Sequence, residues 1–494
     1  MTGTVQIVLP AAILAAGAFV VYVLTRLLRL SNRNEALLTV LVLAGALLLL
    51  LWNFTHMPTW IDESGGFAFN LTPAGGIPFQ PTASGQFIII FSTTLSILVA
   101  IYSGGYLEND PRYRLYYPLL LLTQVGVMGI FSSKDLFNLF LLTELTTVAA
   151  SALIAFRIQQ EIAIKAGFKY LLMSSLGTMI MLLGIYFVFR SSGDLQISAL
   201  LTSPDGFTRI GAACFLVGFS LKAGVVPLHT WVPDAYGHAP SAVSALLAGV
   251  LSKSMLFILP IICLRLGMSR MELGVFLLVF GCANMLLGSI RMLGQKLLRR
   301  LLSFSSIAQT GYLMFSLGIG FLYELREAFS AGLFLLLVIG LMKSLAFLSA
   351  GIYEAHAGSQ DIAQLAGAGH RMPWTALAFS TALGSLAGIP LLAGFTGKWL
   401  IFSAALRTGD LFAGLCLVVF LASTVIGLAG YLPLLVKQYI PGGGPVKASS
   451  SPERVSVWML GPVLLLALLI LGIGLFPTPW IHLIDYVVKW MAFL

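Results

Sequence analysis

The chain has 494 residues, of which 58% are hydrophobic and 10% are charged, whereas about 25% of the residues in a soluble domain are charged. The mean hydropathy is +0.96, so most of the surface must face lipid or other membrane helices, which excludes a soluble enzyme. The formal net charge is +9. In a membrane protein such an excess belongs to cytoplasmic loops, and we expect no nucleic acid partner.

Apolar runs of about 18 to 25 residues, separated by polar residues or by Pro and Gly, predict about fourteen membrane-spanning helices. In chain order the predicted spans are 5–28, 36–54, 85–107, 115–133, 135–156, 168–189, 208–228, 240–264, 271–290, 300–322, 328–350, 373–405, 411–436 and 455–476. The first run has basic residues after it and none before it, unlike a secretory signal peptide, so we expect it to stay as the first span. We also expect an extramembrane loop at 55–84 and a linker at 441–445.

Basic residues are distributed unevenly over the loops between these spans. The loops after odd-numbered spans carry about twice as many Lys and Arg residues as the loops on the other side. The distribution predicts that these loops are cytoplasmic and that both termini are not. We therefore expect a multi-pass protein of the plasma or inner membrane.

Four cysteines lie singly in apolar runs, with no Cys-x-x-Cys pair and no histidine at ligand spacing. The glycine-rich segments are not followed by Gly-Lys-Ser/Thr, so the chain has no phosphate-binding loop. These patterns predict no metal site and no cofactor. We expect this chain to carry out no redox chemistry of its own, although it can be part of a redox complex.

Four lysines lie inside apolar runs: Lys222, Lys253, Lys343 and Lys398. A lysine at the centre of a span costs about 2.5 to 3.5 kcal/mol on insertion scales, so the four together require about 10 kcal/mol from partners or internal water. Small or hydroxyl residues adjoin each of them, which leaves room for water and hydrogen bonds. A path for ions explains the presence of four such lysines better than chance does.

Glu144 lies about ten residues into the fifth span and is the carboxylate clearly at mid-membrane depth. A lone buried carboxylate takes up a proton and becomes neutral, whereas a nearby lysine keeps both groups charged. We therefore expect a cationic partner, with Lys222 as the first choice. The structural alternative is that Glu144 and the four lysines form static salt bridges between helices.

Proline and glycine interrupt two spans beside their lysines. Gly224 and Pro227 follow Lys222, and Gly388 and Pro390 precede Lys398. Broken helices at membrane depth require protein or water to satisfy the freed backbone groups. One broken helix in each half predicts inverted repeats with an ion path in each half.

The predicted fold is therefore all-α and polytopic, with about fourteen transmembrane helices, two inverted five-helix repeats and two broken helices. We divide the chain into N-terminal helices with a loop (1–110), a first repeat (111–266), a second repeat (267–437) and a linker with the last helix (438–494).

The run from Lys222 to Gly249 resembles the signature of the proton-translocating, antiporter-like subunits of respiratory complex I, Mrp-type cation/proton antiporters and membrane-bound hydrogenases. The runs 303–311, 343–351 and 388–398 support this resemblance, which covers about residues 85–435. The resemblance implies that Glu144 and Lys222 form a switching ion pair and that Lys253 relays a proton. It implies that Lys343 and Lys398 complete the path in the second half.

Several positions depart from the pattern of this family. Ile339 stands where relatives often carry a histidine, so passage between the halves would depend on water or other polar groups. Gln295 replaces an acidic residue, and Tyr236 replaces a histidine. Lys398, rather than a glutamate, occupies the terminal site, which points away from one type of complex I subunit. These departures favour an Mrp-like or hydrogenase-like member.

His229, Asp234 and His238 lie in the connection between spans seven and eight. They could form a metal site. We favour the interpretation that they are polar groups that support proton uptake, and we expect no bound metal.

The resemblance implies a proton-translocating membrane subunit of a multi-subunit energy-converting complex of the complex I or membrane-bound hydrogenase type, with Na⁺ left open as a second ion. The alternative is the large subunit of an Mrp-type antiporter without a redox partner, which would use the same residues. A membrane scaffold with vestigial charges is a third class. The expected partners are other membrane subunits and the lipid bilayer.

Overall fold

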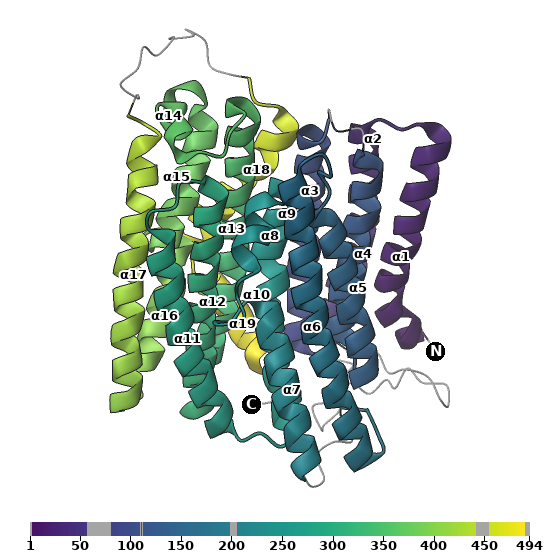
Figure 1. Cartoon of the computed structure of the whole chain (residues 1–494), viewed down its shortest axis with the longest axis vertical. Helices are drawn as coiled ribbons and strands as arrows, with labels where there is room; N and C mark the ends of the chain where they lie inside the picture. Colours follow the sequence, from purple (N-terminus) through teal and green to yellow (C-terminus); the bar gives the residue numbers. More distant parts are fainter. Residues whose placement is uncertain are drawn as a thin grey trace.

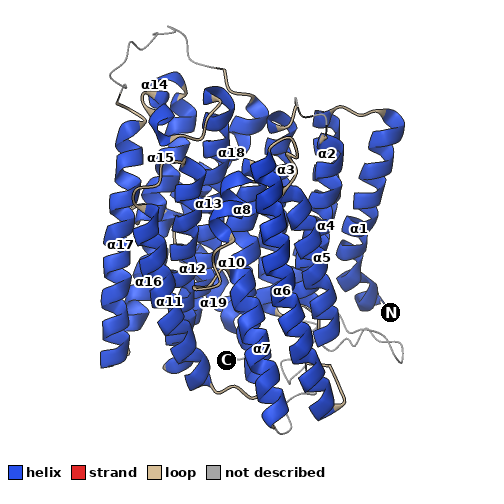
Figure 2. Ribbon diagram, viewed as in Figure 1, coloured by secondary structure: helices blue, strands red, loops and turns tan. Residues whose placement is uncertain are grey.

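The structure is a computed structural model that describes residues 2–56, 81–108, 110, 112–197, 205–440 and 454–489. Within these ranges the regular structure is helical (Figure 2). Most of the loop expected at 55–84 and the linker expected at 441–445 lie outside the described residues. The all-α prediction is confirmed.

The helices form an upright bundle in which α1 and α17 stand at opposite edges (Figure 1). In the first half of the chain they are α1 (Thr2–Leu28), α2 (Asn32–His56), α3 (Ala83–Tyr106), α4 (Tyr113–Ser132), α5 (Leu136–Ile154), α6 (Glu161–Ser192), α7 (Gly206–Ala223), α8 (Val232–His238), α9 (Ser241–Leu246), the π-helical turn η2 (Leu247–Leu251) and α10 (Ser252–Arg265). In the second half they are α11 (Arg270–Met292), α12 (Leu298–Leu322), α13 (Arg326–Ala357), η3 (Ile362–Leu365), α14 (Ala368–Arg371), α15 (Pro373–Ala387), α16 (Ala393–Leu406), α17 (Leu411–Lys437), α18 (Val457–Leu475) and α19 (Thr478–Lys489).

Every predicted span coincides with a helix or with a pair of consecutive helices. Among the described residues, 11 helical segments are long and apolar enough to cross a membrane. The other three predicted spans are α12, which is rich in serine, α7, which corresponds to the span 208–228, and the interrupted helix α15–α16. The helix α8 lies between the predicted spans seven and eight. The protein is therefore a polytopic membrane protein. The short helix α19 was not predicted.

The long helices α12 and α13 form the centre of the bundle. The most apolar stretch of α13 is 100% buried, whereas that of α17, at the edge of the bundle, is 33% buried. A membrane helix that is apolar all round can lie among other helices or face lipid, and the burial shows that α13 does the first and α17 largely the second. The helix α12 packs against α13 and is also buried along most of its length. Polar side chains on these two helices therefore meet other protein groups, not lipid.

Both interrupted helices break at a glycine in the left-handed region. The helix α7 ends at Gly224 with φ +72°, and α15 ends at Gly388 with φ +86°. In Figure 1, α7 begins near the lower face of the bundle and α15 near the upper face, so the two broken helices run in opposite directions. This confirms the two broken helices and agrees with inverted halves.

Two isolated antiparallel bridges occupy equivalent places in the two halves. Asp135 before α5 pairs with Gln196 after α6, and Leu297 before α12 pairs with Asp361 after α13. Each bridge closes a helical hairpin. The pairing supports an internal repeat, and the repeat boundaries at 111–266 and 267–437 stay predictions.

Candidate functional site

The predicted partners Glu144 and Lys222 lie close together but bind hydroxyl groups. Lys222 stands near the end of α7, is 8% exposed, and donates from Nζ to Thr147 Oγ1 at 2.7 Å. Glu144 accepts hydrogen bonds from Ser175 at 2.8 Å and from Thr178 at 2.6 Å, both on α6. The two charged groups remain within electrostatic range of each other. The structure therefore shows the pair separated, with each partner held by hydroxyls that the sequence analysis did not single out.

A small cavity adjoins Lys222. Its volume is about 20 Å³, and Thr147, Lys222, Tyr236 and Ser252 form part of its wall. A space of about 10 to 15 Å³ is enough for one water molecule. Tyr236 and Ser252 are hydrogen-bonded to each other at 2.6 Å. A water molecule in this cavity would therefore connect Lys222 to the beginning of α10.

Lys253 lies on α10, directly after the π-helical turn η2 and Ser252. It is 1% exposed, donates to Ser306 Oγ of α12, and its Nζ lies 5.5 Å from the centre of the Tyr236 ring. An aromatic face stabilises a cation without neutralising it. In the π turn the Leu247 carbonyl accepts from the backbone N–H of Ser252 and also from the hydroxyls of Tyr236 and Ser252, and such turns often mark functional sites.

Lys343 and Lys398 are buried in the second half. Lys343 on α13 is 0% exposed and donates to the Leu302 carbonyl at 3.0 Å and to Ser305 Oγ. Lys398 on α16 donates to the Leu386 carbonyl at 2.9 Å, at the broken end of α15. The last carbonyls of a helix lack intrahelical donors and attract cations, which explains why the lysine binds at the break.

The four lysines form a series through both halves that we call the lysine row. Lys253 and Lys343 bind the neighbouring residues Ser306 and Ser305 of α12, so α12 joins the two halves. Lys222 and Lys398 lie at the two ends of the row, each beside a broken helix. The predicted site residues are thus brought together, and the serine run 303–306 is the sequence signal that marks their connection.

The three polar residues predicted near span eight do not converge. Asp234 forms an ion pair with Lys169 of α6 at 2.5 Å. His229 is half-buried between α7 and α8, and His238 ends α8. The part of the chain that the structure describes contains no group of three side chains able to hold a metal ion.

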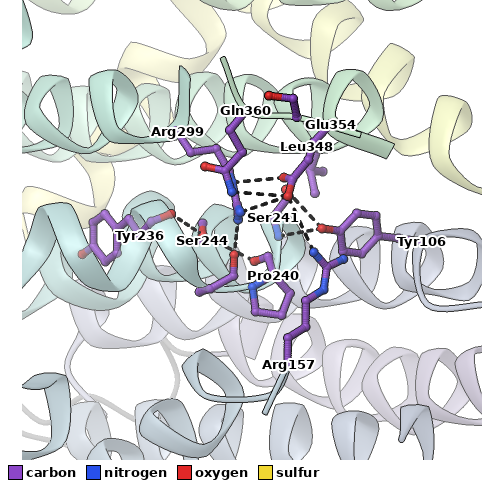
Figure 3. A network of polar contacts seen from close by, with 12 residues as sticks. Tyr106, Arg157, Tyr236, Pro240, Ser241, Ser244, Arg299, Leu348, Glu354 and Gln360 are labelled. Carbon is purple, nitrogen blue, oxygen red and sulfur yellow. Dashed lines mark hydrogen bonds and ion pairs between the residues drawn. The ribbon is translucent and has the colours of Figure 1, made fainter. Parts of the chain in front are cut away.

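A second charged cluster, which the sequence analysis missed, joins the halves near the end of α8 (Figure 3). Arg299 of α12 is 1% exposed, donates to the Ala239 carbonyl and lies 3.2 Å from Glu354. Arg157, between α5 and α6, lies 3.6 Å from the same carboxylate, and Gln360 donates to it at 3.3 Å. We call Arg157, Arg299, Glu354 and Gln360 the Glu354 cluster. The hydropathy pattern placed both arginines in loops between predicted spans, so it gave no signal of their burial.

Comparison with known proteins places this architecture in a family. The sequence profile described as "NADH:quinone oxidoreductase/Mrp antiporter, TM" matches residues 133–427. A relative named NADH-quinone oxidoreductase subunit N 1, from Solidesulfovibrio magneticus, is 32% identical over 413 residues, which cover 82% of this chain and 86% of that protein. A relative named F(420)H(2) dehydrogenase subunit N, from Methanosarcina mazei, is 29% identical over 419 residues, which cover 81% and 82% of the two chains.

A solved structure shares the fold over almost the whole length. A chain of the membrane-bound sulfane sulfur reductase, an archaeal respiratory membrane complex, superposes with a TM-score of 0.85 at 24% identity and covers 98% of this chain and 97% of its own. The named relatives are subunits of an oxidoreductase and of a dehydrogenase. Of the two assignments that the sequence departures favoured, Mrp-like or hydrogenase-like, they do not support an Mrp-type subunit without a redox partner. Because the profile matches more than half of the chain, the protein belongs to the family of membrane subunits shared by NADH:quinone oxidoreductases and Mrp antiporters.

Proposed function

We propose that this chain is the proton-translocating membrane subunit of a redox-driven complex of the complex I type, and that Glu144 and the lysine row carry the protons. The observation that supports this most strongly is the chemistry of the row. The hydrogen bonds of its four ammonium groups go to hydroxyls and backbone carbonyls. Static salt bridges would need carboxylate partners, so the scaffold alternative does not account for this arrangement.

The separated pair suggests how charge movement drives transfer. Two unit charges 4 Å apart interact by about 4 kcal/mol at an effective dielectric constant of 20. Moving the Lys222 ammonium between Thr147 and Glu144 therefore changes, by a similar amount, the energy of a proton on the neighbouring groups. Lys253 and Lys343 pass the proton onward, and Lys398 exchanges it with one membrane face or with a neighbouring subunit.

Proton uptake is assigned to the polar connection around α8. Asp234 and Lys169 are both partly exposed, with 30% and 42% of their side chains accessible. His229 precedes α8 and His238 is its last residue. Burial lowers the pKa of both imidazoles below the usual value, and a neutral imidazole can accept a proton. The basic loops are proposed to face the cytoplasm, with both termini on the other side.

The names of the relatives favour a redox-driven pump over an antiporter. The relatives are named as subunits of an NADH-quinone oxidoreductase and of an F(420)H(2) dehydrogenase, and this chain would assemble with membrane subunits of that kind. The alternative, an Mrp-type subunit without a redox partner, shares the fold and the lysines. The experiment described next also tests whether Na⁺ is a second coupled ion.

The test is proton translocation in sealed vesicles that carry the native assembly. Acidification is driven either by a redox donor or by an imposed Na⁺ gradient, and wild type is compared with Lys222→Ala. Lys165→Ala is the matched control, because Lys165 is 72% exposed and pairs with Glu161 on the surface. Redox-driven acidification that only Lys222→Ala loses supports the pump. Transport driven only by Na⁺ supports the antiporter, and normal transport by assembled Lys222→Ala refutes the proposed mechanism.

A further inference from the structure

Between Lys343 and Lys398 the groups that bind the two lysines are not in direct contact. Lys343 binds Ser305 of α12, whereas Lys398 binds the end of α15. Ile339, one turn before Lys343, is fully buried and cannot carry a proton. Any relay across this gap must therefore use other polar groups.

The structure provides a hydroxyl group that contacts the partner of Lys343. Tyr431 of α17 is 2% exposed, and Ser305 is 0% exposed. The Ser305 hydroxyl accepts a hydrogen bond from Lys343 and forms a second one with the Tyr431 hydroxyl. A hydroxyl can accept one proton and release another, so this pair can pass a proton without net chemical change.

The next polar groups lie on the same face of α12. Gln309 and Tyr312 follow Ser305 by four and seven residues, which places the three on one face of the helix. Gln309 is 1% exposed and neighbours the Tyr431 hydroxyl, and its Oε1 atom has no hydrogen-bond partner among the described residues. A buried amide oxygen of this kind is a place for an ordered water molecule.

Tyr312 lies next to Lys398. Its hydroxyl contacts Ser423 and Thr424 of α17, each at 3.1 Å. The Lys398 ammonium lies 5.1 Å from the centre of the Tyr312 ring. The groups from Ser305 to Tyr312 thus span the gap between the two lysines.

We infer that Ser305 and Tyr431, with a water molecule held by Gln309, relay the proton from Lys343 to Lys398. Lys343 gives a proton to the Ser305 oxygen, and Ser305 gives its own proton to Tyr431. Tyr431 passes one to the water, which delivers a proton to Lys398. Lys398 accepts it as a neutral amine, after its ammonium has released a proton to one membrane face or to a neighbouring subunit, and each hydroxyl regains its original state by rotation. Gln309 only positions the water, because an amide does not exchange protons readily.

This inference rests on the proposed function, and the variants separate the two. Tyr431→Phe and Ser305→Ala each remove one hydroxyl. The matched controls are Tyr353→Phe and Ser303→Ala: Tyr353 is buried and donates to Gln438 at 3.1 Å, and Ser303 is buried on α12 and donates to the Arg299 carbonyl at 2.7 Å.

The measurement is the initial rate of proton translocation by assembled complex in sealed vesicles, in H₂O and in D₂O. A positioned proton-transfer group contributes on the order of a hundredfold or more, so we expect each relay variant to slow translocation at least about tenfold and to increase its solvent isotope effect. The double variant should be no slower than the slower single variant, since the groups act in series. The controls should stay within about twofold of wild type.

Wild-type rates for both relay variants, while Lys343→Ala and Lys398→Ala abolish translocation, would overturn the relay and leave the proposed function intact. Wild-type transport by Lys343→Ala would overturn the proposed function itself. If Tyr431→Phe fails to assemble, Ser305→Ala decides the question, because it keeps every aromatic ring in place.

Discussion

Hydroxyl groups hold the buried charges of this protein. Thr147 accepts from Lys222, and Ser175 and Thr178 donate to Glu144. A hydrogen bond to a charged group contributes about 1.5 to 3 kcal/mol, which is less than a close ion pair at low dielectric constant. Such partners satisfy the charge and still let it move.

Thr147→Val tests this role at the residue scale. Valine keeps the shape of threonine and removes the acceptor of Lys222, so we expect slower proton translocation, with a loss smaller than that of Lys222→Ala. Thr123→Val is the control, because Thr123 is equally buried and donates only to the Leu119 carbonyl on its own helix. Equal rates for the two threonine variants would show that the Thr147 contact is dispensable.

The broken helices are the elements that place lysines beside free backbone groups. Gly388 ends α15 in the left-handed region, and a Cβ atom there would lie 3.3 Å from Lys398 Cδ and 3.5 Å from its Nζ. A side chain at this position would therefore strain the backbone and disturb the lysine at once.

Gly388→Ala tests this element, with Gly409→Ala as its control. Both glycines have positive φ, +86° and +61°, but a Cβ atom at Gly409 would meet nothing within 4 Å. Alanine in this conformation costs roughly 1 to 2 kcal/mol, so both variants should unfold at a lower temperature. We expect only Gly388→Ala to slow proton translocation as well. If Gly388→Ala and Gly409→Ala translocate protons at equal rates, the geometry of the break does not matter for the role of Lys398.

At the scale of the whole molecule, the two halves meet through α12 and through the Glu354 cluster. Arg157 and the Ala239 carbonyl belong to the first half, and Arg299 and Glu354 belong to the second. The cluster lies where α8 meets α9, so it fixes the broken helix of the first half to the second half. A shift in one half would be transmitted through these contacts.

Glu354→Gln removes the charge that both arginines share. Breaking a buried ion pair costs about 3 to 5 kcal/mol, and 17% of the Glu354 side chain is exposed, so we expect the lower end of this range. Glu327→Gln is the control, since Glu327 and Arg407 form a surface pair with 60% and 65% of their side chains exposed, worth less than about 1 kcal/mol. Thermal unfolding of the purified protein should show the larger decrease in unfolding temperature for Glu354→Gln. Equal decreases would contradict the role of the Glu354 cluster in holding the two halves together.

The sequence by itself determined the membrane class, the positions of the predicted spans and the four buried lysines, because apolar run length and a lysine within such a run are local properties of the chain. Glu144, which was expected to be buried as well, is half-buried. It also located both breaks, because Gly and Pro stand close together there and end a helix, whereas single prolines such as Pro260 and Pro433 lie inside helices. The short amphipathic helix α19 was missed because it has no long apolar run.

Only the tertiary structure decided which groups those charges meet. Lys253 and Ser306 are 53 residues apart, and Ser305 and Tyr431 are 126 residues apart; no periodicity in the chain relates them. The burial of Arg299 was equally invisible, because its polar neighbours gave the segment the composition of a loop. Hydropathy tells which residues enter the membrane, whereas helix packing decides whether a buried charge finds a carboxylate, a hydroxyl or a carbonyl, and that choice separates a static salt bridge from a proton path.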